Sequence, residues 1–253
     1  MCLILVAWQH HPDYPLVVAA NRDEFFARPT VPAEFWASAA ELLAGRDLEA
    51  GGTWLGVTRA GRFAALTNFR DPGQMRRDAP SRGRLVTDFL IDRSAPLDYL
   101  ATIAPEAPRY NGYNLLVGDG RSLCAYSNVA GAPHPLPPGI YGLSNHLLDT
   151  PWPKVAQSKS ALEAALAALP DEAPLFRLLR NDDMHPDETL PRTGVSLEWE
   201  RILSAAFVRS PDYGTRCSTV LLARRDGRVS FDEQTWLPGA VAGGRARFSF
   251  AAD

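Results

Sequence analysis

Two uninterrupted hydrophobic runs begin the chain, one over residues 2–8 and one over residues 15–20. An apolar run of this length is typical of a strand covered on both faces, because a half-exposed strand alternates apolar and polar residues. Residues 9–14 between the runs read Gln-His-His-Pro-Asp-Tyr, which is turn chemistry. The pattern therefore predicts two buried strands that fold back on each other, with the turn centred near Pro12.

That pairing brings a thiol close to a cluster of polar residues. In the antiparallel register Cys2 lies opposite Asn21 or Arg22, and facing Cβ atoms in such a pair are about 5 Å apart. The second strand runs directly into a polar tetrad, Asn21-Arg22-Asp23-Glu24. We therefore predict that Cys2 and the tetrad are neighbours in space.

The rest of the chain reads as further hairpins and helices. Additional strands are predicted at residues 52–58, 62–69, 113–117, 123–127, 140–143, 217–223, 228–235 and 246–250, the last within an otherwise loosely held tail. Helices are predicted at residues 85–91, 96–103, 153–169 and 175–180, with a partly helical segment at 197–207 and a helical turn at 37–43 in an irregular stretch. Antiparallel hairpins with segregated helices indicate an α+β fold, in which two stacked antiparallel sheets with outer helices cover every buried strand.

Composition and charge narrow the class of protein. The chain has 253 residues, 46% of them hydrophobic, with no repeat or long linker, so we predict a single domain over residues 1–253. A formal net charge of -3 gives no reason to expect a nucleic-acid partner. The sequence shows no stretch of membrane-spanning length and no secretory signal. Three cysteines without a close pair fit a reducing compartment, so a cytoplasmic location is expected.

Cys2 has the chemistry of an N-terminal nucleophile. Its small side chain makes Met1 a target for removal, after which Cys2 carries both a thiol and a free α-amine. The unperturbed pKa values of these groups are about 8.5 and about 7.7 to 8.0, so the amine is able to act as base for its own thiol. Arg22 would favour the thiolate, and Asp23 would hold the ammonium or orient Arg22. The alternative is that Cys2 is an ordinary apolar strand residue and the tetrad is a solvated turn with ion pairs.

Several motifs together resemble the NRDE family, also called the transport-and-Golgi-organisation family. They are Met-Cys at the start, the tetrad, Gly-Gly-Thr-Trp-Leu-Gly at 51–56, Leu-Thr-Asn-Phe-Arg at 66–70, Gly-Leu-Ser-Asn at 142–145 and Gly-Thr-Arg at 214–216. The resemblance implies the four-layer αββα sandwich of the N-terminal nucleophile (Ntn) hydrolases, near the cysteine acylases that cleave penicillin V and conjugated bile salts. Eukaryotic members are linked to haem trafficking and to lipid or acyl-CoA handling, so fold alone does not fix the function.

The resemblance also suggests roles for individual residues. Asn145 matches an asparagine that donates to the oxyanion in the cysteine acylases, and Asn68 is expected to assist it. Arg216 matches a late arginine near the nucleophile. Arg22 and Asp23 match an early arginine and aspartate only roughly, because those enzymes read Arg-Asn-x-Asp. Substrate contacts are expected at Asn21, Glu24, Gly52, Trp54 and Arg70.

Each of these assignments has a structural alternative. Asn145 would serve equally as the cap of a turn, and Arg216 as the partner of a surface carboxylate. Gly52 either lets the backbone approach a ligand closely or marks a bulge at the start of a strand. The loop at residues 71–84 either closes over an anionic substrate or is simply solvated. Its arginines are Arg76, Arg77, Arg82 and Arg84.

Two functions follow from the sequence, each with a small-molecule ligand as partner. The first is an Ntn-type amidohydrolase, acting without a cofactor on a small non-peptide amide or thioester. The second is a non-catalytic carrier of haem or an acyl-CoA, whose arginines meet propionates or phosphates. A metal site is not expected, because the histidines at positions 10, 11, 134, 146 and 185 lack metal-ligand spacing. The sequence also lacks the Cys-x-x-Cys-His pattern that attaches haem covalently.

Overall fold

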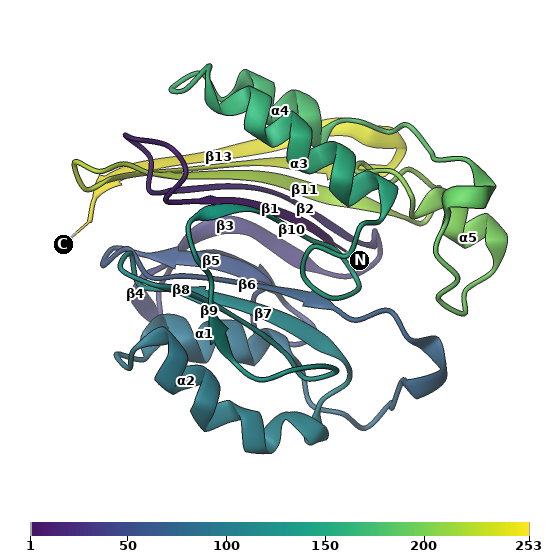
Figure 1. Ribbon diagram of the computed structural model, residues 1–253, viewed down its shortest axis with the longest axis horizontal. Helices are drawn as coiled ribbons and strands as arrows, with labels where there is room; N and C mark the ends of the chain where they lie inside the picture. Colours follow the sequence, from purple (N-terminus) through teal and green to yellow (C-terminus); the bar gives the residue numbers. More distant parts are fainter. Residues whose placement is uncertain (1, 253) are drawn as a thin grey trace.

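Two antiparallel sheets stack face to face in the computed structural model, which describes residues 2–252 (Figure 1). The first sheet has the order β10-β1-β2-β11-β12-β13, with bounds β1 (Cys2–Trp8), β2 (Leu16–Phe25), β10 (Gly139–Leu143), β11 (Tyr213–Ala223), β12 (Arg228–Leu237) and β13 (Val241–Ala251). The second sheet runs from β3 to β9 in chain order, with bounds β3 (Thr30–Trp36), β4 (Ala39–Asp47), β5 (Leu55–Thr58), β6 (Phe63–Asn68), β7 (Tyr113–Gly118), β8 (Leu123–Ser127) and β9 (His134–Pro135).

Helices cover the outer face of each sheet (Figure 1). On the first sheet lie α3 (Pro153–Leu166) and α4 (Ala173–Leu179), on the second lie α1 (Gly83–Ile91) and α2 (Pro96–Ile103), and α5 (Leu197–Ile202) sits at one end of the first sheet. Short 3₁₀ helices are η1 (Pro72–Gln74), η2 (Ala104–Arg109), η3 (Asp187–Thr189) and η4 (Pro238–Ala240). The order of layers is helix, sheet, sheet, helix, which confirms the predicted α+β sandwich.

Apolar side chains fill the three spaces between these four layers. β1 is buried along its whole length, with Ile4 and Val6 packed between the sheets and Leu3 and Leu5 packed under the helices. This is the arrangement that an unbroken hydrophobic run predicts, because the pleat turns successive side chains to opposite faces.

The pairing of β1 with β2 confirms the predicted hairpin register. Cys2 lies directly opposite Arg22, one of the two partners expected for it. Val18 and Ala20 of β2 belong to the core between the sheets, whereas Val17 and Ala19 belong to the core under the helices. Continuing that alternation, Arg22 and Glu24 are on the inner face of β2, toward the second sheet, and Asn21 and Asp23 are on its outer face.

The helical turn predicted at residues 37–43 is wrong, because that segment enters β4. Its Ala-Ala-Glu-Leu-Leu sequence has helical propensity, but Leu42 and Leu43 are both buried, one in the core under α1 and α2 and the other between the sheets. Burial on alternate faces is available only to a strand. The irregular stretch before it forms β3, where Pro32 is accommodated by a register shift between Val31 and Glu34.

The tail is also more regular than predicted. β13 pairs with β12 along most of its length, and Phe248 and Phe250 stack edge-on against Phe35 of β3. These aromatic contacts anchor a segment that is otherwise rich in small residues. The strand predicted at residues 52–58 begins later, at Leu55, so Gly52 precedes it.

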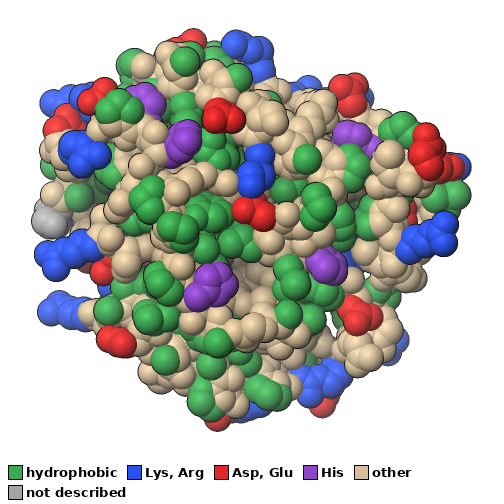
Figure 2. All heavy atoms as spheres, in the orientation of Figure 1, with side chains coloured by type: hydrophobic (Ala, Val, Ile, Leu, Met, Phe, Trp, Pro, Cys, Tyr) green, Lys and Arg blue, Asp and Glu red, His purple; other side chains and the backbone are tan. Residues whose placement is uncertain are grey.

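Charged side chains are spread over the face of the molecule shown in Figure 2, where Lys and Arg do not gather into a single patch. Among the helices described, none is long and apolar enough to cross a membrane.

Candidate functional site

A cleft of about 730 Å³ opens between the two sheets at the end where β1 begins and β2 ends. Its lining contains Cys2 and three members of the tetrad, together with residues of β6, β11, β12 and the loop before α1. Of the predicted site residues, the cleft brings together Cys2, Arg22, Asp23, Glu24, Gly52, Trp54, Asn68 and Arg216. Asn21, Arg70 and Asn145 are not part of its described lining.

Cys2 is at the base of this cleft, with 9% of its surface exposed. The backbone N–H of Asp23 donates to its sulfur, and its carbonyl accepts a 3.0 Å hydrogen bond from Ser144 Oγ. Burial raises the pKa of the Cys2 thiol, and the Asp23 carboxylate raises it further, while Arg22 lowers it. The thiol is therefore held in place by its neighbours and depends on nearby cations to ionise.

Arg22 reaches into the cleft beside Cys2 and is held there by a network of charges. Its Nη2 lies 3.4 Å from Asp47 Oδ2, and the same oxygen accepts a 2.7 Å bond from Arg28 Nε. Arg28 in turn contacts Glu49 at 3.1 Å and Glu24 at 3.9 Å. Although burial alone raises it, the Arg28 hydrogen bond holds the pKa of Asp47 below its usual value. Ionised Asp47 thus fixes the cation opposite the thiol.

Asp23 is almost completely buried, with 1% exposure. Its Oδ1 accepts a 2.7 Å hydrogen bond from Thr215 Oγ1, and its carbonyl accepts one of 3.1 Å from the Tyr213 hydroxyl. Burial raises the pKa of the Asp23 carboxyl, whereas the positive charges of Lys154 and Arg70 lower it. These positive charges thus offset part of the cost of burying the carboxylate.

Asn21 has a different surrounding from the rest of the tetrad. Its Nδ2 donates to the carbonyls of Leu179 and Ala206 at 2.7 and 2.8 Å, and its Oδ1 accepts from Ser218 Oγ at 2.6 Å. The amide is fully buried on the outer face of β2, where it joins α4 and the segment before β11. Asn21 therefore lies outside the described lining of the cleft, and the ligand contact expected for it stays a prediction.

The two candidate oxyanion donors are in contact, but only one reaches the cleft. Asn145 Nδ2 donates to the carbonyl of Asn68 at 2.9 Å, and the Asn145 carbonyl accepts from the backbone N–H of Arg70 at 2.8 Å. Asn145 is fully buried, whereas Asn68 lines the cleft. Among the described residues, no side chain or backbone group is hydrogen-bonded to the side-chain amide of Asn68. Asn145 thus holds the strand end that presents Asn68.

Arg216 lines the cleft, but its guanidinium forms hydrogen bonds with the segment between the end of β2 and the start of β3. Its Nη1 donates to the carbonyls of Phe25 and Arg28 at 2.8 and 3.1 Å, and its Nη2 donates to Thr30 Oγ1 at 3.2 Å. It is the residue at the bulge where the pairing of β11 with β2 shifts register, between Thr215 and Cys217. Arg216 therefore shapes the cleft wall through the loop from β2 to β3.

Gly52 and Trp54 both line the cleft, although Gly52 has a structural reason to be glycine. A Cβ at Gly52 would lie 2.5 Å from the backbone carbon of Gly83, at the first residue of α1. The close approach thus serves the packing of α1 against the second sheet. The ligand contact predicted for Gly52 stays a prediction.

The loop before α1 contributes positive charge to the cleft. Arg76, Arg77 and Arg82 line it, whereas Arg84 is not part of the described lining. Arg82 Nη1 donates to the Gly112 carbonyl at 2.9 Å. Burial lowers the pKa of Arg82, and the nearby Cys2 and Glu24 act in the opposite direction.

The model of the family described as Transport and Golgi organisation 2 matches residues 1–238. The chain belongs to this family. The Transport and Golgi organization protein 2 homolog of Bos taurus is 42% identical over 261 residues, with 94% of each chain covered. The human homolog is 40% identical with the same coverage, and the Drosophila melanogaster protein is 30% identical, covering 93% of this chain and 92% of its own.

Two solved structures match most of the chain at low sequence identity. A conjugated bile acid hydrolase from Clostridium perfringens is 10% identical, with a TM-score of 0.45, and covers 99% of this chain and 92% of its own. A Caenorhabditis elegans ortholog of the N-acylethanolamine-hydrolyzing acid amidase is 12% identical, with a TM-score of 0.43, and covers 87% of this chain and 92% of its own.

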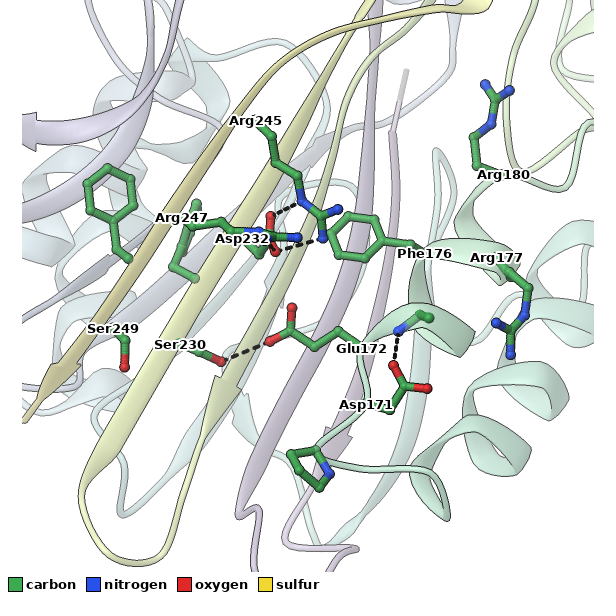
Figure 3. A pocket seen from close by; sticks show the side chains of 14 residues that line it. Asp171, Glu172, Phe176, Arg177, Arg180, Ser230, Asp232, Arg245, Arg247 and Ser249 are labelled. Atoms are coloured by element: carbon green, nitrogen blue, oxygen red, sulfur yellow. Dashed lines mark hydrogen bonds and ion pairs between the residues drawn. The ribbon is translucent and has the colours of Figure 1, made fainter.

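A second hollow, of about 1000 Å³, is present in this member of the Transport and Golgi organisation 2 family (Figure 3). It lies between α4 and the outer face of β12 and β13, and β13 is beyond the family match. Arg245 and Arg247 converge on Asp232, at 2.7 to 2.9 Å, and Glu172 Oε1 accepts from Ser230 Oγ at 3.2 Å. Asp232 is thus paired with two arginines.

Sequence reasoning missed several groups around the cleft of this family member. Cys217 lies opposite Arg22 on the next strand, and its thiol is hydrogen-bonded to buried Glu233. Glu233 Oε1 also accepts the backbone N–H of Ala33 at 2.7 Å, which joins the two sheets. Residues 217 and 233 lie on the inner faces of the neighbouring strands β11 and β12. The sequence indicates that they meet near the cleft only once the order of the strands is known. Among the described residues, no cluster of His, Cys, Asp and Glu is arranged to hold a metal ion.

Proposed function

We propose that this chain is an Ntn-type amidohydrolase-like enzyme, with Cys2 as nucleophile after removal of Met1, acting on a small non-peptide amide or thioester. The observation that carries the proposal is the position of Cys2: its sulfur accepts the Asp23 N–H at the base of a cleft, opposite the cation Arg22. Met1 itself lies outside the described residues. An exposed α-amine on Cys2 would serve as the base for the thiol.

The reaction begins when the amine takes the thiol proton and the sulfur attacks the substrate carbonyl carbon, forming a C–S bond. Collapse of the tetrahedral adduct breaks the bond to the leaving amine or thiol, which receives the proton from the ammonium. Water then attacks the thioester, with the amine accepting its proton, and the C–S bond breaks to release the acid. The side-chain amide of Asn68 supports the oxyanion, because it lines the cleft and is not engaged by another described group.

The walls of the cleft support a substrate with an apolar acyl part and an anionic remainder. Val31, Trp54 and Leu66 contribute apolar surface, while Arg76 and Arg77 contribute positive charge. Guanidinium groups bind carboxylates and phosphates with paired hydrogen bonds, which would orient the anionic end.

The test uses the purified protein with a panel of small amides and thioesters. Intact mass should show loss of Met1, and Cys2→Ala should abolish turnover, whereas Cys124→Ala, a buried thiol under the opposite helices, should keep it. Turnover by Cys2→Ala, or full activity in protein that retains Met1, would overturn the enzymatic proposal.

A second function, carriage of haem or an acyl-CoA without catalysis, is supported by the arginines of the loop before α1 that line the cleft. The names of the relatives refer to transport and Golgi organisation, which agrees with a carrier. Titration with haemin and with a long-chain acyl-CoA should then show saturable binding that Arg76→Ala/Arg77→Ala weakens and Cys2→Ala leaves unchanged. Equal binding by the arginine variant would reject the proposed contact.

A further inference from the structure

The cleft that contains Cys2 is lined by more basic than acidic side chains. Seven arginines line it against five aspartates and glutamates. The acidic residues already accept hydrogen bonds or ion pairs from neighbouring groups of the chain. Positive charge in the cleft therefore exceeds negative charge, and a ligand that supplies an anion would balance it. The arginines are those at positions 22, 28, 46, 76, 77, 82 and 216.

Most of these arginines are held by the protein itself. Arg22 and Arg28 contact the same carboxylate, Arg216 donates to the segment between β2 and β3, and Arg82 donates to a carbonyl just before β7. Arg46 has its guanidinium 4.8 Å from the centroid of a tryptophan ring that belongs to the core under α1 and α2. These five guanidinium groups are therefore engaged with the protein before any ligand binds.

The two remaining arginines are neighbours in the loop before α1, and their side chains differ. Arg76 Nη2 donates to the carbonyls of Pro108 and Arg109 at 3.0 and 2.5 Å. Among the described residues, none is hydrogen-bonded to, ion-paired with or stacked on the guanidinium of Arg77. Arg77 is thus the arginine of the lining whose donors stay available to a ligand.

The loop is fastened on both sides of Arg77. Asn111 forms two hydrogen bonds with the backbone of Arg76: its Oδ1 accepts the N–H at 2.8 Å, and its Nδ2 donates to the carbonyl at 2.9 Å. Further along, Arg82 Nη1 donates to the Gly112 carbonyl at 2.9 Å. Both attachments are to the two residues directly before β7, so the free arginine is carried by a pinned segment. Pinning lowers the ordering cost that a ligand would have to overcome.

Arg77 and Cys2 lie at different depths of the cleft. Arg77 is exposed although it lines the cleft, so it is at the mouth, whereas Cys2 is buried at the base. Trp54 and Leu66 contribute apolar lining to the same cleft. A ligand that reaches both ends would place its carbonyl at the thiol and an anionic group at the mouth.

We propose that Arg77 is a specificity-determining residue that binds a terminal oxyanion, a carboxylate or a phosphate, of the ligand whose carbonyl lies at Cys2. The inference rests on the proposed function of the cleft and narrows its substrate class to acyl compounds with an anionic group distant from the reactive carbonyl. A guanidinium suits this task because it pairs with two oxygens of a carboxylate or phosphate at once. The other arginines of the lining maintain the shape of the cleft.

The test measures protection of Cys2 against alkylation by iodoacetamide, read by peptide mass, so that it does not depend on turnover. The probes are N-butanoyl amides whose amine part ends in a methyl group, a carboxylate or a phosphonate, each with a short and a longer methylene spacer. In wild type the anionic probes should protect at concentrations about tenfold lower than the methyl probes, the effect of one charge-assisted pair. High salt should reduce this preference. The better of the two anions identifies the oxyanion that the site prefers.

Arg77→Met should remove the preference for anionic probes, and Arg77→Lys should keep part of it. Arg84→Met is the matched control and should behave as wild type, because Arg84 is an exposed arginine in the first turn of α1 that is not part of the described lining. Equal protection by all probes in wild type, or an Arg77→Met variant that keeps the preference, would overturn the inference. If wild type hydrolyses no amide or thioester but the preference depends on Arg77, the enzymatic proposal fails and the anion subsite stands.

Discussion

The two faces of β2 at its polar end hold different kinds of charge. On the inner face, Arg22 and Glu24 border the cleft and take part in a partly exposed network around Asp47 and Arg28. On the outer face, Asn21 and Asp23 are at most 1% exposed, although Asp23 also contributes to the cleft lining. Neighbouring residues of one tetrad therefore have different environments, because the pleat of a strand points successive side chains to opposite faces of the sheet.

The energetic consequence differs between the faces. An exposed or half-exposed ion pair contributes little to stability, because water competes for both charges. A buried polar group that loses its partner costs the full desolvation of what remains. We therefore expect changes on the outer side to reduce the free energy of unfolding and changes on the inner face to alter chemistry.

The largest effect should come from Arg70→Leu, which leaves Glu200 buried without its cation. Loss of one partner of a buried pair costs about 3 to 5 kcal/mol, measured as the free energy of unfolding in urea. The double variant Arg70→Leu/Glu200→Leu should recover much of the loss. Arg109→Leu, at an exposed pair with Glu106, is the control and should change nothing measurable. An equal loss of unfolding free energy in Arg70→Leu and Arg109→Leu would contradict the expected difference between buried and exposed ion pairs.

The next effect concerns pH. The native pKa of Lys154 is about 8, below its ordinary value, so between pH 8 and about 10.4 the unfolded chain holds a proton that the native chain has lost. Stability from this group therefore rises with pH in that window, by about 3 kcal/mol. The stability of wild type relative to Lys154→Met should rise accordingly in urea unfolding at each pH. A constant difference would mean that Lys154 is not held in a strongly desolvated position.

Asn21→Ala should lower stability by about 2 to 3 kcal/mol, because two buried carbonyls and the Ser218 hydroxyl lose their partner. Alkylation of Cys2 in the folded variant should stay close to wild type, measured at a temperature well below its melting point. A large fall in thiol reactivity without loss of stability would instead assign Asn21 to the chemistry of the cleft.

The smallest effect on stability should come from Arg22→Met, at about 1 kcal/mol or less. The variant should nevertheless alkylate Cys2 several-fold more slowly, because the thiolate loses the cation opposite it. Arg22→Lys should restore part of the rate. Unchanged alkylation of Cys2 in Arg22→Met would show that Arg22 does not promote ionisation of the thiol.

The sequence predicted the β1–β2 hairpin well, because an unbroken apolar run and a polar turn leave one register that buries both strands. It failed at residues 37–43, where Leu42 and Leu43 suit a helix locally and a strand only in the presence of two neighbouring layers. The length of the strand in the tail was underestimated for the same reason. Phe248 and Phe250 pack against Phe35, over 200 positions earlier, and no local pattern indicates that contact. Tertiary contacts override weak local preference.

The sequence predicted only part of the site, again because some of its residues are placed by contacts between distant segments. Local reading placed Cys2 opposite Asn21 or Arg22, and the resemblance pointed to Asn145, with Asn68 expected to assist it. Neither indicated which asparagine would reach the cleft. The groups missed altogether, such as Lys154, come from helices whose placement over the sheet no local pattern encodes.

The sequence by itself determined the first hairpin, the α+β layering and the presence of a thiol beside the tetrad, because alternation and hydrophobic run length act within a few residues. Only the tertiary structure decided which tetrad residue lies outside the cleft, which of the two candidate asparagines is buried, and that Lys154 is buried. Those outcomes depend on the desolvation of charges by distant elements, and a charge buried by another part of the chain has no local signature.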